Sequence, residues 1–417
     1  MMKKVYVYEN WEKEEATLIG ILYIENIRGS EVYSFEFERT WLDNPSIKIL
    51  DPYLNLYGGR QYPIDKKIFG IFSDSAPDRW GRVLLDRKEK ILSSKEARKP
   101  KKLFESDYLL GVYDETRIGA LRFKTDKDGE FLSSDSDNSV PPWTTLRTLE
   151  EASRNFERDD DILNDKWLSQ LIKPGSSLGG ARPKATIKDQ EGELWIAKFP
   201  SKNDEYDVGL WEKVVHDLAK MCNLNVPESK LEKFSKYGST FLVKRFDREK
   251  NKRIHFSSAM TMLGKQDGAS AVDGTSYIDI ASFIKSFGCN PKKDLIELWK
   301  RIVFNMAISN TDDHLRNHGF IMTSKGWELS PLYDVNPVPY GEYLSLNVSE
   351  SNNAIDISAA IEVSKFYGLS TNEAIVEANK IIRTVKNNWE KIAKSYGAPR
   401  REIEYMLQAF ELKTVDE

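Results

Sequence analysis

Cysteine and histidine are scarce in this chain. Its 417 residues include only two cysteines, Cys222 and Cys289, and four histidines. The cysteines lie far apart and in no CxxC spacing, which argues against a disulfide framework and against a zinc site built on thiolates. This usage is typical of a reducing compartment, so we expect a cytoplasmic protein.

Long apolar runs and a strong net charge are also missing. The longest early apolar run, LIGILYI at 18–24, is too short to span a bilayer, and the start MMKKVYVYENWEKEE lacks the apolar segment of a signal peptide. The formal net charge is −4, from 61 basic and 65 acidic residues. That balance argues against a protein that mainly coats nucleic acid or anionic lipid. We therefore expect no membrane association.

The length and composition indicate a globular chain of several parts. Hydrophobic residues make up 40% and charged residues 30%, and 417 residues exceed one typical core. We expect an α+β fold in three segments: a β-rich segment at 1–125, a second at 126–250 and a mainly helical third at 251–417. The polar stretch 125–142 is the best linker candidate. The basic run KEARKPKK, 95–102, is interpreted as a solvated helix end or loop.

Helices and strands alternate along the middle of the chain. Apolar periodicity predicts helices at 67–92, 144–157, 165–173 and 208–222. The strands KATIKD and LWIAKFP flank Glu191-Gly192-Glu193, which is a hairpin turn by composition. A strand follows at STFLVKRFDR. Further on, HGFIMT and WELSPLYD predict a second hairpin around Ser-Lys-Gly, and 371–413 is predicted helical.

A glycine-rich loop, SSLGGARPK, occupies residues 176–184. Gly179 and Gly180 allow successive backbone N–H groups to turn toward an anion, and Arg182 and Lys184 add positive charge. The GxxxxGK[ST] order of a Walker A loop is missing. A Gly-Gly pair is also common in ordinary turns.

Lys198 interrupts the apolar strand LWIAKFP. A strand lysine can pair with nucleotide phosphates, as in protein kinases, when a glutamate on a following helix holds it. Glu212 lies in the next predicted helix and is the natural candidate. Both residues could instead face solvent.

The stretch SNTDDHLRNHGF, 309–320, combines acids, amides and imidazoles. Asp312 and Asn317 have the Asp-x-x-x-x-Asn spacing of the kinase catalytic loop, in which the aspartate accepts the proton of the attacking hydroxyl and the asparagine binds magnesium. Asp334 follows the predicted hairpin, where a second magnesium-binding aspartate is expected. Hard oxygen ligands of this kind suit Mg²⁺. Asp313 is not expected to be a ligand.

His314 and His318 raise the alternative of a metal hydrolase. At i and i+4 on a helix, two imidazoles would share one face, as in HExxH. The glutamate is absent, and a strand begins at His318. A histidine-based transition-metal site is therefore disfavoured, and we expect His314 to pack and hydrogen-bond within the catalytic loop.

The order of these signals favours a phosphotransferase. A glycine-rich loop, a strand lysine, a helix glutamate, a helical segment, Asp-x-x-x-x-Asn, a hairpin and a final aspartate follow one another as in a bilobal kinase. The motifs SLGGARPK, AKFP, VKRFDR, SNTDDHLRN and PLYDV resemble the HipA family of serine/threonine kinases, the toxins of bacterial HipBA-type toxin–antitoxin modules. Residues 73–85 and 107–123 resemble the family's N-terminal region.

This resemblance implies a bilobal protein-kinase-like fold with an extra N-terminal subdomain, and it implies roles for single residues. Ser177 matches the loop serine that family members autophosphorylate, although Ser176 is adjacent. The phosphate loop would include Gly179, Gly180, Ala181 and Lys184. The remaining ATP contacts would come from Lys198 at the phosphates and from Lys244 and Phe246 beside adenine, with Asp312 as catalytic base and Asn317 and Asp334 as Mg²⁺ ligands. Many relatives carry an acidic residue where this chain has Lys244.

The resemblance further implies ATP and Mg²⁺ as cofactors, and partners for the chain. The partners would be a separate antitoxin chain of helix-turn-helix type and a protein substrate such as an aminoacyl-tRNA synthetase or translation factor. DNA contact would come only through the antitoxin. Phosphorylation of Ser177 would switch the enzyme off, because ATP phosphates repel a phosphoserine. Two alternatives stay open: a catalytically weak corepressor bound to the antitoxin, and a small-molecule kinase.

Overall fold

A computed structural model of the protein describes residues 2–11, 15–44, 49–77, 79–134, 140–158, 166–175, 180–249 and 252–415. The chain divides into two compact units. The first holds residues 1–203 and 242–257, and the second holds 204–241 and 258–417. Within the described ranges, no helix combines the length and the apolarity that crossing a membrane requires. The three segments expected from the sequence stay predictions.

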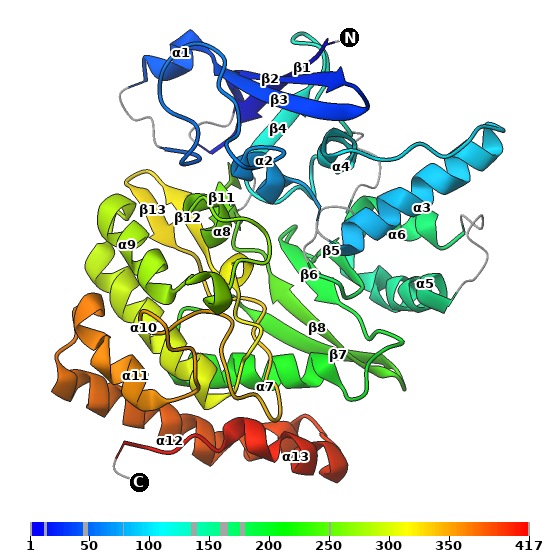
Figure 1. The fold of residues 1–417 in the computed structure, drawn as a ribbon. Coiled ribbons are helices and arrows are strands. Elements are labelled where there is room, and N and C mark those ends of the chain that lie inside the picture. The colour runs from blue at the N-terminus through cyan, green and yellow to red at the C-terminus, as the bar shows by residue number, and fades with distance from the viewer. Residues whose placement is uncertain are drawn as a thin grey trace. The chain divides into compact units, whose positions relative to one another are not determined.

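A four-stranded sheet begins the first unit (Figure 1). Its order is β3-β2-β1-β4, with β1 at Met2–Glu9, β2 at Thr17–Ile27, β3 at Ser30–Phe37 and β4 at Leu121–Lys124. β1 pairs antiparallel with both neighbours, so Tyr6 lies opposite Ile21 on one side and Lys124 on the other. Val5 and Val7 on β1 are fully buried. The predicted β-rich start of the chain is confirmed.

The helices of the first unit are α1 (Arg39–Leu42), α2 (Gly70–Ser75), α3 (Arg79–Lys95), α4 (Glu105–Gly111), α5 (Leu146–Arg158) and α6 (Leu168–Gly175). Four of them, α2, α3, α5 and α6, lie where the sequence predicted helices, and α1 and α4 were not predicted. The helix predicted at 67–92 is interrupted between α2 and α3. Pro77 explains the break, because a proline disfavours the helical conformation of the residue before it, and Ala76 is extended at ψ 160°. α6 packs against both α3 and α5.

A hairpin follows α6 and carries two of the predicted site residues. β5 (Lys184–Lys188) and β6 (Leu194–Lys198) pair antiparallel across a turn in which Gly192 N donates to Asp189 O at 3.2 Å. Gly192 adopts φ +83°, which glycine reaches without strain. The sheet order here is β5-β6-β8-β7, and the boundary between the two units falls inside β8 (Gly238–Lys244). The predicted hairpin is confirmed. Short strands complete this part of the chain: β9 (Arg248–Glu249), β10 (Lys252–Arg253) and, at the unit boundary, β11 (Phe256–Ser258).

The second unit starts with α7 (Val208–Met221), which is followed by β7 (Ser229–Ser235). The Asp207 side chain caps α7 by accepting from Leu210 N at 3.2 Å, and it also accepts from Ser239 N at 2.8 Å. Gly209 allows the close approach of α7 to β8, since a Cβ at this position would lie 2.2 Å from Ser239 O. The predicted helix at 208–222 is confirmed.

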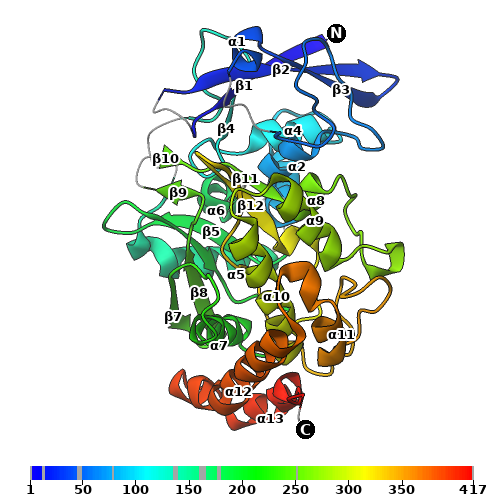
Figure 2. The same cartoon turned by 90° about the vertical axis from the view of Figure 1, so that its left-hand side faces the viewer.

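The remaining helices build most of the second unit (Figure 2). They are α8 (Ala259–Met262), α9 (Tyr277–Phe287), α10 (Pro291–Ala307), α11 (Ile357–Glu362), α12 (Thr371–Ser395) and α13 (Arg400–Met406). α10 packs against α9, α11 and α12, and α12 also packs against α7. Trp299 on α10 is fully buried and donates from Nε1 to Ala360 O at 2.8 Å. The helical C-terminal part is as predicted.

A second hairpin follows α10. β12 (Gly319–Thr323) and β13 (Gly326–Leu329) pair antiparallel, with Phe320 opposite Leu329. The predicted hairpin is confirmed, but its second strand ends at Leu329 rather than continuing to Asp334. The loop between α10 and β12 contains the predicted catalytic residues.

Candidate active site

The loop 308–318 holds Asp312 and Asn317 in one tight turn of the second unit. A 3₁₀ turn at Leu315–Asn317 brings the two residues together, and Asn317 Nδ2 donates to the backbone carbonyl of Asp312 at 2.8 Å. The backbone N–H of His314 donates to the same carbonyl at 3.0 Å. The Asp312 side chain is 81% exposed, whereas Asn317 is buried. The loop thus presents one carboxylate to solvent beside a fixed amide.

Asp334 lies beyond β13 in a left-handed backbone conformation, at φ 56°. Such a conformation costs about 1–3 kcal/mol for a residue other than glycine and persists only where the surroundings impose it. The preceding Tyr333 supplies one such restraint, because its hydroxyl donates to Arg316 O at 2.6 Å. This bond ties the Asp334 segment to the loop of Asp312 and Asn317.

The donor set of this loop fits Mg²⁺. Asn317 Nδ2 is engaged by the Asp312 carbonyl, so the amide oxygen is the ligand that remains for a cation. Mg²⁺ is usually bound by one or two protein side chains together with waters and substrate phosphates. Asn317 and Asp334 would hold it here, and the bound ion would neutralise charge on transferring phosphates.

The two histidines of the loop lie in different surroundings. His314 is partly exposed, its Nε2 lies 4.0 Å from Asp312 Oδ1, and its Nδ1 accepts from Arg316 N at 3.3 Å. His318 is fully buried, with Nε2 2.9 Å from Asp313 Oδ1. In the part of the chain that the structure describes, no three His, Cys, Asp or Glu side chains are grouped to hold a metal ion.

Two lysines face each other in the first unit. Lys184 on β5 is the register partner of Lys198 on β6, and both are buried. Directly opposed residues of an antiparallel pair point to the same face, and like charges placed so are destabilising. The register therefore places two buried lysines on one face of the hairpin.

The described part of the glycine-rich loop lies against Lys184. A Cβ on Gly180 would lie 2.7 Å from Lys184 Nζ, so the glycine allows the ammonium group to approach the backbone. Gly180 also adopts φ +74°, and its carbonyl accepts from Trp80 N at 3.0 Å. Arg182 Nη2 donates to Phe199 O at 3.2 Å, and Ala181 is exposed. Ser176, Ser177 and Gly179 lie outside the described residues.

The two residues expected beside adenine lie at the end of β8, the neighbour of β6 in the sheet, and just after it. The Lys244 ammonium lies 3.3 Å from Glu193 Oε2, so this lysine has an acidic partner on the neighbouring hairpin. The Phe246 ring packs against Phe256 at 5.9 Å between centroids. Lys198 and Glu212 belong to different units, and their predicted pairing stays a prediction.

A buried ion network adjoins this stretch. The Asp247 carboxylate accepts from Arg245 Nε at 2.8 Å, from Arg248 Nη1 at 2.9 Å and from Gly119 N at 2.8 Å. Burial alone would raise the pKa of Asp247, but the charges of Arg245 and Arg248 and these hydrogen bonds hold that pKa below its ordinary range. The network fixes residues 245–248 against the 115–119 loop of the same unit.

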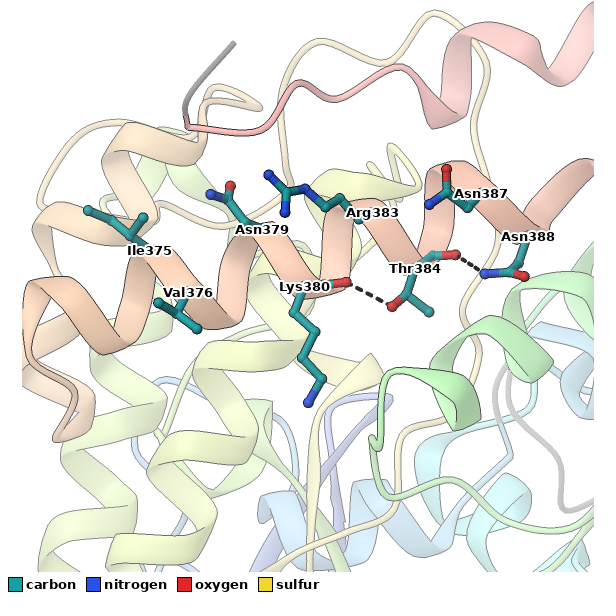
Figure 3. A pocket seen from close by; sticks show the side chains of 8 residues that line it. All are labelled: Ile375, Val376, Asn379, Lys380, Arg383, Thr384, Asn387 and Asn388. Carbon is teal, nitrogen blue, oxygen red and sulfur yellow. Dashed lines mark hydrogen bonds between the residues drawn. The ribbon is translucent and has the colours of Figure 1, made fainter.

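A surface hollow of about 630 Å³ lies along α12 (Figure 3). Its lining comes from that one helix: Ile375, Val376, Asn379, Lys380, Arg383, Thr384, Asn387 and Asn388. Asn379 and Arg383 point to one side of the helix and Lys380 to the other. Asn379 Oδ1 accepts from Val415 N at 2.9 Å and so holds the C-terminal segment. The lining has no carboxylate and none of the predicted catalytic residues, so this hollow is not the phosphotransfer site.

Residues 176–414 match the HipA-like C-terminal domain family. The chain belongs to the HipA family. The match begins at the glycine-rich loop and includes every catalytic and ATP-binding residue that the sequence predicted. The chain therefore has the kinase-like α+β fold of this family.

Several curated proteins are similar to this chain over part of their length. A curated protein of Haemophilus influenzae is 30% identical over 197 residues, which cover 41% of this chain and 57% of the relative. The serine/threonine-protein kinase toxin HipA of Shewanella oneidensis is 28% identical over 224 residues, or 46% of this chain and 50% of that toxin. The chain thus aligns with about half of the length of these relatives.

A solved HipA structure shows the same fold over nearly the whole chain. It is the complex of HipA and HipB with operator DNA from Shewanella oneidensis MR-1. One of its chains matches with a TM-score of 0.69 at 18% identity, covering 97% of this chain and 96% of the other. The expected N-terminal region therefore belongs to the shared fold.

Sequence reasoning did not predict the burial of Asp313. Its side chain is 1% exposed, and its hydrogen bonds come from Tyr277 and Asn305, which no spacing rule connects to it. The pair Lys184 and Lys198 could have been found earlier, because the turn at Gly192 fixes the strand register that places them opposite each other.

Proposed function

We propose that the chain is an ATP- and Mg²⁺-dependent protein serine/threonine kinase. The observation that carries this proposal is the loop geometry: an exposed Asp312 carboxylate beside an Asn317 amide that is fixed on the Asp312 carbonyl. Asp312 would orient the attacking hydroxyl and accept its proton. Asn317 and Asp334 would hold the metal ion, and His314 would support the loop.

The first unit would supply the nucleotide contacts. Lys184 and Lys198 would bind the ATP phosphates with the backbone of Gly179 and Gly180, because fixed positive groups stabilise charge on a transferring phosphoryl group. Lys244 and Phe246 would lie at the adenine side. The opposed buried lysines support this assignment. Glu212 would orient Lys198.

The proposed biological role is that of a toxin in a type II toxin–antitoxin system in the cytoplasm. A HipA relative is named as a toxin, and the solved HipA structure is a complex with HipB and operator DNA. We propose a separate antitoxin of helix-turn-helix type as partner, and DNA contact through it. The protein substrate would be a translation-related protein such as an aminoacyl-tRNA synthetase.

Transfer of labelled phosphate from ATP tests the kinase proposal. The purified protein is incubated with γ-labelled ATP, Mg²⁺ and a cell lysate, and the labelled species are identified. Asp312→Asn should lower transfer by about 10²–10⁴-fold, because it removes the general base. Asp128→Asn changes an exposed aspartate and should behave as wild type. Full activity of Asp312→Asn would refute the assignment, and label in small molecules alone would indicate a small-molecule kinase.

Autophosphorylation at Ser177 is proposed to switch the enzyme off. A phosphoserine carries about −1.5 to −2 charges and would be repelled by ATP phosphates. Ser177→Asp should weaken ATP binding, measured by calorimetry, whereas Ser176→Ala should retain it. ATP affinity equal to wild type in Ser177→Asp would exclude this regulation.

A further inference from the structure

Asp312 and Asp313 are neighbours with opposite environments. The Asp312 side chain is 81% exposed and the Asp313 side chain is 1% exposed. Burying a carboxylate is costly unless hydrogen bonds replace its lost hydration. A chain that places one aspartate in solvent and buries the next must therefore supply partners for the second.

Three side chains of the same unit surround the Asp313 carboxylate. The Tyr277 hydroxyl and Asn305 Nδ2 each donate to Oδ2 at 2.5 Å, and His318 Nε2 lies 2.9 Å from Oδ1. All three partners are buried. Burial, and then the charge of Asp313, raise the pKa of the Tyr277 hydroxyl well above its usual range, so the hydroxyl keeps its proton and stays a donor.

These partners come from three elements around the loop. Tyr277 is the first residue of α9, Asn305 lies in the last turn of α10, and His318 directly precedes β12. Asn305 also binds the start of the loop: its carbonyl accepts from Asn310 N at 2.8 Å and its Oδ1 from Asn310 Nδ2 at 3.1 Å. The Asp313 carboxylate is thus the common acceptor that joins α9 and α10 at the loop.

We propose that Asp313 is a positioning residue, whose buried carboxylate sets the direction in which Asp312 projects from the loop. The peptide bond between the two residues is planar, so fixing Asp313 restricts the backbone of Asp312 to few conformations. The same backbone carbonyl of Asp312 receives Asn317 Nδ2 and His314 N. The inference rests on the proposed kinase function, in which Asp312 and Asn317 must act on one phosphoryl group.

The position of Asp313 calls for a hydrogen-bond acceptor. An ionised carboxylate only accepts hydrogen bonds, and donors from Tyr277 and Asn305 converge on one of its oxygens. An Asn side chain offers one acceptor oxygen instead of two, so an N–H₂ group takes the place of one carboxylate oxygen. Asp313→Asn therefore preserves volume while disturbing the loop.

Kinetic constants of Asp313→Asn test the proposal. We expect kcat to fall by about 10- to 100-fold, since small displacements of a catalytic group cost up to two orders of magnitude. The KM for ATP should stay within about two-fold, because Asp313 is not proposed to touch the nucleotide. Tyr277→Phe should lower kcat in the same direction, and the double variant should lose less than the product of the two effects.

Asp294→Asn is the matched control in the same unit. Asp294 is also buried and accepts from Leu329 N at 3.0 Å, but it lies outside the loop. The substitution Asp294→Asn should lower Tm while leaving kcat per folded molecule unchanged. A wild-type kcat in Asp313→Asn would overturn the positioning role. The role would also be overturned if Asp313→Asn, like Asp294→Asn, loses activity only in proportion to its unfolded fraction.

Hydrogen exchange separates this inference from the proposed function. The amides of His314 and Asn317, both hydrogen-bonded inside the loop, should exchange at least ten-fold faster in Asp313→Asn and in Tyr277→Phe than in wild type. If Asp313→Asn does not fold, the exchange rates of these two amides in Tyr277→Phe test the positioning role. Absence of phosphotransfer in the wild type would refute the kinase proposal, whereas unchanged exchange of these amides in both variants would refute the positioning role.

Discussion

The side-chain amide of Asn317 donates a hydrogen bond to the backbone carbonyl of Asp312 over 2.8 Å. The residue proposed to hold Mg²⁺ is thereby oriented by the residue proposed to be the base. This hydrogen bond explains why Asp312 and Asn317 must lie in one loop at a fixed spacing. It also makes the amide group, rather than side-chain size, the feature to test.

Asn317→Asp should lower phosphotransfer by about ten-fold or more, because it removes the donor and places a carboxylate against a carbonyl oxygen. Activity is measured across a Mg²⁺ titration. Asn353→Asp is the matched control. Asn353 Nδ2 also donates to a backbone carbonyl, that of Leu344, over 2.7 Å, and Asn353 lies outside the loop. Equal activity of Asn317→Asp and wild type at all Mg²⁺ concentrations would contradict the assignment.

Lys184→Met and Lys198→Met should each abolish most of the thermal stabilisation by ATP. A ligand present at 100 times its Kd stabilises the folded state by about 2.7 kcal/mol, so a loss of affinity is read directly from the change in Tm with ATP. Lys188→Met, on the same strand but paired with Glu115 at 2.8 Å and 40% exposed, should keep the full shift. An intact ATP shift in both buried-lysine variants would exclude the lysine pair as the phosphate site.

His255 should make the protein less stable as the pH falls below 6.5. Burial lowers the pKa of this imidazole to about 3, and its ring stacks on Trp11 at 4.7 Å. The unfolded chain binds the proton between pH 6.5 and 3 and the folded protein does not, so the free energy of unfolding falls by about 1.4 kcal/mol per pH unit in this window. Between pH 7 and pH 5, His255 should therefore lower the free energy of unfolding by about 2 kcal/mol.

Denaturant unfolding of His255→Phe and His255→Gln at both pH values checks this expectation. Both variants lack the imidazole, so both should lose this part of the pH dependence even though their stabilities at pH 7 differ. A variant that keeps the wild-type slope between pH 7 and 5 would show that another group titrates there.

Asp247→Asn should lower the free energy of unfolding by about 3–5 kcal/mol, the usual cost of removing one partner of a buried ion pair. Because the pKa of Asp247 lies below its ordinary range in the folded protein, its stabilisation is present above about pH 4 and is lost as the pH falls toward the folded-state pKa. Urea unfolding at pH 7 measures the first effect. Glu249→Gln, at an exposed position two residues on, should change stability by less than about 0.5 kcal/mol.

The sequence predicted local structure well because local patterns determine it. Apolar periods gave the helices that became α5, α7 and α12, and turn composition gave the hairpins β5-β6 and β12-β13. The break between α2 and α3 at Pro77 was missed. The proline does indicate it, because its ring conflicts sterically with a helical conformation of the preceding residue. The end of β13 at Leu329 was also missed, since apolar residues beyond it pack without strand pairing.

Spacing likewise determined which residues of SNTDDHLRNHGF carry the proposed chemistry. Asp312 and Asn317 meet through a single turn, so five residues of sequence separation are enough to bring them together. The opposition of Lys184 and Lys198 is equally local, because the turn between their strands sets the register.

Only the tertiary structure decided between the two adjacent aspartates. Asp312 and Asp313 have identical side chains and share their neighbours in sequence. Asp313 is buried because Tyr277, 36 residues away, and Asn305, 8 residues away on another helix, bring donors to it. Burial of a charge depends on hydrogen-bond partners from distant segments, and no periodicity or spacing within the loop encodes where those segments pack.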